Sequence, residues 1–183
     1  MKHLRLMYLL FFVFNITNLS AEGKDIKLNK LFNELKVDNI SLSYQAEQKI
    51  WKLWSTHAND EKLTAMLAKG SELVNKKKFY EAITIFSEII NSDPKWAEAW
   101  NKRATVLYMV GEFQKSQDDI NKVLELEERH FGALAGQGLV NIQLENYDKA
   151  IISYEKAKQI YPTMKSPKIM IEQIKELIKK QSI

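Results

Sequence analysis

Histidines are the side chains best suited to acid–base or metal chemistry near neutral pH, and this chain has three, His3, His57 and His130. His57 and His130 lie far apart in the sequence. Neither belongs to the zinc-enzyme pattern in which two histidines and a carboxylate share one helix face. The absence of cysteine excludes thiolate ligands, disulfides and a thiol nucleophile. We therefore expect no metal site, and we expect His57 and His130 to be surface or helix-end residues.

Two further patterns contain residues used in catalysis or phosphate binding, but they lack the required spacing. Gly132, Gly136 and Gly138 match neither the nucleotide-binding lysine loop nor the dinucleotide fingerprint, and they fall within a predicted helix. Asp118 and Asp119 are adjacent, and adjacent residues of a helix point about 100° apart, so their carboxylates do not share a proton. We expect a protein that is not an enzyme and has no cofactor.

The composition favours one helical domain. The chain has 183 residues, of which 45% are hydrophobic and 27% charged, with 6 glycines and 3 prolines. So few turn residues disfavour a β-sandwich or barrel, in which the chain reverses direction about every ten residues. The sequence therefore predicts an all-α fold.

The beginning of the sequence has the three-part pattern of an export signal. Lys2 and Arg5 precede an apolar run from Leu6 to Phe14, and a polar stretch then ends at Ala21. The run is shorter than the roughly 20 residues that a membrane-spanning helix needs. We expect residues 1–21 to be a removable signal, with an uncleaved anchor as the alternative.

Removing residues 1–21 leaves an almost neutral protein. The chain has 27 basic and 23 acidic residues for a formal charge of +4, and the signal contains two of the basic residues and none of the acidic ones. A chain so close to neutrality lacks the positive charge on which nucleic-acid binding depends. We therefore expect no nucleic-acid partner, and we interpret Lys76, Lys77 and Lys78 as a solvated loop.

The chain repeats itself at a period of 34 residues. Small residues in two columns predict close helix crossings, and aromatic or large apolar residues in the other two predict packing between helices. The coinciding sets are Gly70, Ala104 and Gly138; Ala82, Ser116 and Ala150; Phe79, Phe113 and Tyr147; and Phe86, Ile120 and Tyr154.

These columns resemble the tetratricopeptide repeat, a helix–turn–helix unit. The resemblance implies a right-handed α-solenoid with three repeats, at residues 63–96, 97–130 and 131–164. Lys69 and Arg103 stand where the family has leucine, and Leu107 and Asn141 stand where it has an aromatic residue, so we expect somewhat looser packing there. 

The repeats have a helical segment on each side. We expect a flank over residues 22–62, with a helical hairpin that packs on the first repeat and a core role for Trp51 and Trp54; a ligand-stacking pair is the alternative. Residues 165–183 are expected to form a capping helix that begins with Ser166 as N-cap and Pro167.

A narrower resemblance concerns three segments, residues 50–54, 100–105 and 129–134. They are similar to a group of short exported alphaproteobacterial proteins with these repeats and no assigned role. The resemblance implies a periplasmic or secreted bacterial protein, with an inner-membrane protein facing the periplasm as the alternative.

The first helices of successive repeats line one concave groove, which in this chain is more apolar than charged. Family members that clamp the terminal carboxylate of heat-shock proteins carry several cations there, whereas the corresponding residues here include only Lys102. We expect the groove to bind a peptide or helix of an envelope partner through Leu67, Ser71, Asn101, Lys102, Thr105, Tyr108, Leu139 and Ile142.

Two other functions remain open. The first alternative is a structural self-associating unit, whose groove is filled by its own flank or by a second copy. The second is a membrane-anchored assembly factor, for example in cytochrome c maturation or cell-wall synthesis. A homo-oligomer is allowed in each case, and membrane contact is expected only through an uncleaved signal.

Overall fold

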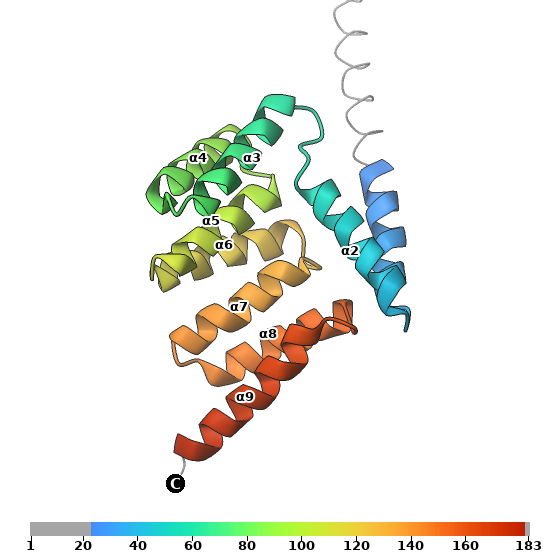
Figure 1. The fold of residues 1–183 in the computed structure, drawn as a ribbon, viewed down its shortest axis with the longest axis vertical. Helices are drawn as coiled ribbons and strands as arrows, with labels where there is room; N and C mark the ends of the chain where they lie inside the picture. Colours follow the sequence, from blue (N-terminus) through green and yellow to red (C-terminus); the bar gives the residue numbers. More distant parts are fainter. Residues whose placement is uncertain (1–22, 182–183) are drawn as a thin grey trace, which may run out of the picture.

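The computed structural model describes residues 23–181, which are helical apart from short connections (Figure 1). The predicted signal lies outside the described residues. No helix within the described residues is both long and apolar enough to cross a membrane. A helix over residues 23–35 is followed by α2 (Ile40–Trp54), α3 (Glu61–Asn75), α4 (Phe79–Ser92), α5 (Ala97–Met109), α6 (Phe113–Leu126), α7 (Phe131–Gln143), α8 (Tyr147–Ile160) and α9 (Lys165–Gln181).

The 34-residue period is visible in the helices themselves. The second helices of the three repeats, α4, α6 and α8, begin at the equivalent residues Phe79, Phe113 and Tyr147. The pairs α3/α4, α5/α6 and α7/α8 stack one after another, and α9 follows below them in Figure 1. The prediction of an all-α stack of three helix pairs is confirmed.

The close helix crossings lie at the predicted small residues. A Cβ atom at Gly70 would collide with the ring of Phe86, and one at Gly138 would lie 2.5 Å from the ring of Tyr154. In the middle repeat Ala104 takes the place of glycine, and it packs in one cluster with Ile120 instead of an aromatic ring. In each repeat the two residues at the crossing are therefore matched in size: glycine faces an aromatic ring, and alanine packs with isoleucine.

The turn inside each repeat uses one left-handed residue. Lys77, Gly111 and Glu145 stand at equivalent positions and have φ values of 59°, 83° and 59°. Only Gly111 adopts this conformation without a Cβ penalty. The first and third repeats thus make the same turn without glycine.

The flank hairpin does not make its main apolar contact with the first repeat, so that prediction is wrong. Its buried residues Leu35, Ile50 and Trp54 share one core with Phe131 at the start of α7 and Tyr161 after α8. In Figure 1 the helix over residues 23–35 and α2 run along one side of the stack. Helical periodicity identified the buried face of the hairpin but could not identify what covers it.

The last helix covers the end of the third repeat. Ile171 and Ile174 of α9 are buried against Ala150 and Tyr154 of α8. The helix begins at Lys165, so Ser166 is already inside it and is not the N-cap that the sequence suggested.

Candidate functional site

A cavity of about 300 Å³ opens between the first helices of the second and third repeats, α5 and α7. Residues of α6 and Met164, which follows α8, complete its wall. We call this cavity the α5–α7 groove. It is lined by Asn101, Ala104, Thr105, Tyr108, Ser116, Ile120, Gly132, Ala133, Ala135, Gly136, Leu139, Val140 and Met164.

Four of the eight residues proposed from the sequence lie together in this groove. Asn101, Thr105, Tyr108 and Leu139 all line it. Leu139 is 38% exposed and so is accessible to a ligand, whereas Asn101 is nearly buried and donates to Glu98. Their grouping follows from helical spacing, since Asn101, Thr105 and Tyr108 recur on one face of α5.

The other four residues lie elsewhere. Leu67 is 2% exposed in the core of the first repeat, which removes it from the set of accessible groove residues. The hydroxyl of Ser71 donates to the carbonyl of Leu67. Ile142 packs against the core of the third repeat, and Lys102 pairs with Glu98 outside the lining of the groove.

The α5–α7 groove presents an apolar and uncharged surface. Among the described residues that line it, none carries a formal charge. The polar groups there are largely satisfied within the fold: the hydroxyl of Ser116 donates to the carbonyl of Ala104, and that of Thr105 donates to the carbonyl of Asn101. The groove therefore suits an apolar side chain or helix face better than a carboxylate or phosphate.

A buried acid–histidine pair lies next to this groove, at the junction of the second and third repeats. Glu98 Oε2 lies 3.1 Å from His130 Nε2, and both side chains are completely buried. His130 is the N-cap of α7, where its Nδ1 accepts a hydrogen bond from the Ala133 N–H. Because Nδ1 is an acceptor, the ring proton lies on Nε2 and is donated to Glu98. His130 is thus a helix-end residue as expected, but it is not at the surface.

The Glu98 carboxylate is held ionised by its neighbours. Burial by itself would raise its pKa, but the hydrogen bond from His130 and the positive charge of Lys102 outweigh burial, so the pKa lies below its ordinary value of 4.5. Lys102 Nζ lies 3.2 Å from Glu98 Oε1, and Asn101 donates to Oε2. The Glu98–His130 pair thus joins α5 to the start of α7.

The flank contacts every repeat junction. Trp54 stacks on His130 with ring centroids 3.9 Å apart, and its carbonyl accepts from the indole of Trp96. Further along α2, Glu47 accepts from the hydroxyl of Tyr161. The flank therefore stabilises the spacing of the repeats in addition to covering their edge.

The flank closes one end of the α5–α7 groove without filling it. A Cβ atom at Gly132 would lie 2.6 Å from the Trp51 ring, so glycine there permits this close approach. Within residues 23–181, no flank residue lines the groove. The described part of the flank therefore reaches only the edge of the groove, where the Trp51 ring lies against Gly132 and 5.9 Å from Lys102 Nζ, and the hypothesis of a self-filled groove stays a prediction.

Two more clefts lie between the second helices of neighbouring repeats, and they are equivalent to each other at the 34-residue period. In the cleft formed by α4, α5 and α6, Arg103 donates to both carboxylate oxygens of Asp119, at 2.8 and 2.7 Å, and to Ser87. These side chains join neighbouring repeats. The expected loosening at Arg103 is thus offset by a bidentate ion pair.

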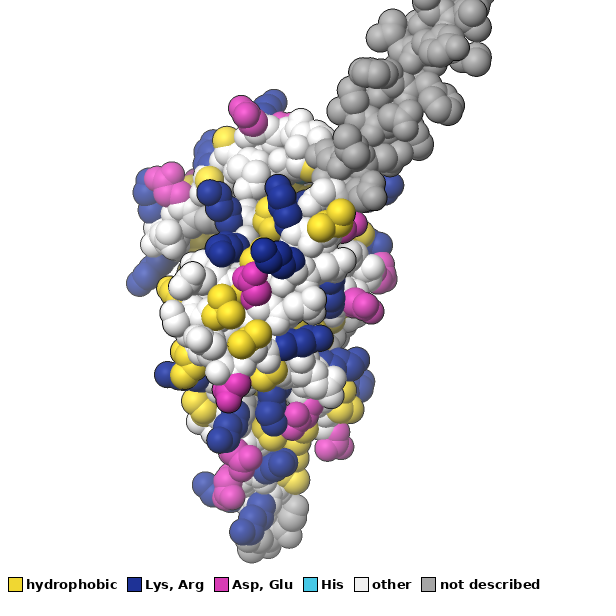
Figure 2. All heavy atoms as spheres, turned by 90° about the vertical axis from the view of Figure 1, so that its right-hand side faces the viewer, with side chains coloured by type: hydrophobic (Ala, Val, Ile, Leu, Met, Phe, Trp, Pro, Cys, Tyr) yellow, Lys and Arg dark blue, Asp and Glu magenta, His cyan; other side chains and the backbone are white. Residues whose placement is uncertain are grey.

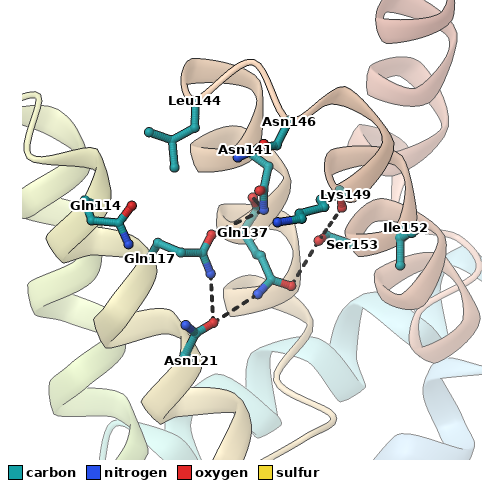
Figure 3. A pocket seen from close by; sticks show the side chains of 10 residues that line it. All are labelled: Gln114, Gln117, Asn121, Gln137, Asn141, Leu144, Asn146, Lys149, Ile152 and Ser153. Atoms are coloured by element: carbon teal, nitrogen blue, oxygen red, sulfur yellow. Dashed lines mark hydrogen bonds between the residues drawn. The ribbon is translucent and has the colours of Figure 1, made fainter.

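The cleft formed by α6, α7 and α8 replaces these charges with amides (Figure 3). Gln137, at the position equivalent to Arg103, donates to Asn121 and accepts from the hydroxyl of Ser153. Asn141 donates to Gln117 in the same network. Asn141 therefore makes hydrogen bonds where the family has an aromatic residue, which is why it is tolerated in a buried position.

Sequence reasoning missed Glu98 and Met164. Glu98 and Lys102 stand four residues apart, the spacing of a surface ion pair on a helix, so the spacing gave no indication that the carboxylate is buried. Met164 enters the groove because the chain turns after α8, and no periodic pattern predicts the path of that connection.

Comparison with known proteins agrees with this architecture. Residues 132–164 match the family model of the tetratricopeptide repeat. A TPR repeat-containing protein of Rhizobium etli is 26% identical over 159 residues, which cover 87% of this chain and 78% of that protein. The Hsp70-Hsp90 organizing protein 1 of Glycine max is 31% identical over 86 residues, or 47% of this chain, but the match covers only 15% of its length.

Solved structures show the same fold. The first TPR domain of Spaghetti (RPAP3), bound to the HSP90 peptide SRMEEVD, has a TM-score of 0.63 at 19% identity and covers 66% of this chain and 95% of that one. The Sgt2 TPR domain from Aspergillus fumigatus has a TM-score of 0.64 at 18% identity, and the match covers 67% of this chain and 83% of that one.

Proposed function

We propose that this chain, a tetratricopeptide-repeat protein, is a noncatalytic interaction module. It would bind a peptide or helix of a partner protein in the α5–α7 groove. The observation that carries the proposal is the groove itself. It is open and apolar, and it places Tyr108 and the exposed Leu139 on facing helices.

The chemistry of the groove selects the partner. The first TPR domain of RPAP3 is bound to the HSP90 peptide SRMEEVD, which is acidic, and the TPR2B domain of yeast Sti1 is in a complex with pHsp70. Here the positions that would hold a terminal carboxylate are Leu67, Ser71, Lys102, Gly132 and Gly136. The single cation is paired with Glu98, so the proposed ligand of this groove is an apolar segment without a required carboxylate.

Substitutions in the groove test this function. We expect the double variant Tyr108→Ala, Leu139→Glu to bind the partner at least about tenfold more weakly, because it removes apolar contact area and places a charge in the groove. The partner is first identified by affinity capture from cell-envelope extracts with the unmodified protein. Its affinity for each variant is then measured by isothermal titration calorimetry.

A matched control lies on another surface. Ile152 is 54% exposed on α8 and lines the amide cleft instead of the groove, so Ile152→Glu adds the same charge away from the proposed site. It is expected to leave the affinity unchanged. If the groove variant and the control bound every captured partner equally well, the groove would not be the binding site.

We further propose that the protein acts in the bacterial periplasm or after secretion. The support is the signal pattern of residues 1–21. The intact mass of the protein isolated from cells is expected to equal that of a chain beginning at Glu22. A mass that includes residues 1–21 would instead favour the inner-membrane anchor.

A further inference from the structure

The flank carries a second cleft, of about 490 Å³, on the face of the hairpin between the helix over residues 23–35 and α2. Lys27 and Lys30 line it from the first helix, and Lys49 and Lys52 line it from α2. Glu34 is the one acidic residue in the lining. We call this site the lysine cleft. Figure 2 shows lysine and arginine side chains gathered around hydrophobic atoms in the upper half of the side that carries the flank.

The four lysines are exposed, and their charges are not neutralised within the fold. No ion pair or side-chain hydrogen bond joins any of the four ammonium groups to another of the described residues. By contrast, lysines on the repeats commonly pair with a carboxylate, as Lys76 does with Glu72 and Lys122 with Glu125. The lysine cleft is therefore a local positive patch on a nearly neutral protein.

Apolar side chains accompany this charge. Leu53 lines the cleft, and Ile26, one helical turn before Lys30, is 63% exposed. The opposite face of the hairpin is already used, because Leu35 and Ile50 are fully buried in the core shared with α7. The two helices thus present an outward face that combines lysines with exposed aliphatic surface, which is the composition of surfaces that lie on membranes.

We propose that the lysine cleft docks the protein on an anionic phospholipid surface. Lysines near such a surface gain about 1 kcal/mol each, or roughly fivefold in affinity, so four of them suffice for salt-sensitive binding. The aliphatic side chains of Leu53 and Ile26 beside the lysines favour a lipid surface over an acidic protein partner. This contact is separate from the proposed groove function, and it revises the expectation that only an uncleaved signal touches the membrane.

Vesicle binding tests the proposal on the full-length chain. To prevent the apolar run from inserting, all proteins carry Leu9→Asn, Leu10→Asn, Phe11→Asn and Phe12→Asn, which leave the charge unchanged. Partitioning onto phosphatidylglycerol and phosphatidylcholine vesicles is measured by co-sedimentation at low ionic strength. The cleft variant replaces Lys27, Lys30, Lys49 and Lys52 with glutamine, and the control variant does the same at the exposed residues Lys156, Lys175, Lys179 and Lys180.

The two variants lose the same charge from different places. We expect the cleft variant to bind phosphatidylglycerol vesicles about 600-fold more weakly and the control variant to change by less than about threefold. Circular dichroism confirms that both remain folded. Equal losses in the two variants, or no preference for phosphatidylglycerol, would overturn the proposal. Binding to polyglutamate without binding to vesicles would also overturn it, and would assign the cleft to an acidic polypeptide.

Discussion

Replacing Glu98 with alanine is expected to lower the free energy of unfolding by about 3–5 kcal/mol. The change leaves the side chain of His130 with a buried, unpaired Nε2–H and removes the acceptor for Asn101. It also removes the ion pair of Lys102. Because the carboxylate joins α5 to α7, the loss affects the whole junction of the second and third repeats. Urea denaturation followed by circular dichroism measures the change.

An exposed glutamate supplies the control for this prediction. Glu88 on α4 is exposed and has no ion pair among the described residues, so Glu88→Ala is expected to change stability by less than about 0.5 kcal/mol. If Glu98→Ala cost no more than Glu88→Ala, the buried pair would contribute nothing to the stability of the junction.

The same carboxylate makes the stability of the protein depend on pH. The pKa of Glu98 in the folded state lies below its ordinary value of 4.5, because its hydrogen bond from His130 and the charge of Lys102 outweigh burial. Its contribution is therefore complete above about pH 4.5 and decreases as the pH falls below this value. The difference in unfolding free energy between the unmodified protein and Glu98→Gln is expected to shrink over that acid range. A difference that stayed constant would contradict the lowered pKa.

The sequence predicts the repeats better than it predicts the flank, and the physical reason is the range of the interactions. Gly138 and Tyr154 belong to one repeat and recur at a fixed spacing, so their contact follows from the period. Trp51 and Gly132 meet through the placement of the hairpin across the repeats, and no spacing encodes that placement. Helical periodicity gives only the buried face of each flank helix.

The candidate groove was predicted in part for a related reason. Tyr108 and Leu139 lie on the inner faces of α5 and α7, which the repeat alignment identifies. Leu67 stands at the position equivalent to Asn101 and Ala135, which line the groove, but it is buried in the core of the first repeat. Alignment places a residue on a helix face, whereas its exposure depends on neighbouring side chains that differ between repeats.

A large packing effect is expected at Gly138. A methyl group there would lie 2.5 Å from the ring of Tyr154, and because both residues are buried neither helix can move away freely. Gly138→Ala is therefore expected to lower the free energy of unfolding by about 3 kcal/mol, although alanine is the better helix former. The measurement is again urea denaturation.

The middle repeat shows how to relieve this collision. It pairs Ala104 with Ile120 at the positions equivalent to Gly138 and Tyr154. Adding Tyr154→Ile to Gly138→Ala should therefore recover part of the lost stability, and the double variant should be more stable than the sum of the single effects predicts. Tyr154→Phe is the matched control. It removes a buried hydroxyl that has no partner among the described residues but keeps the ring, so it should not rescue Gly138→Ala. Rescue by phenylalanine, or additive losses with isoleucine, would show that contact with the ring does not determine the need for glycine.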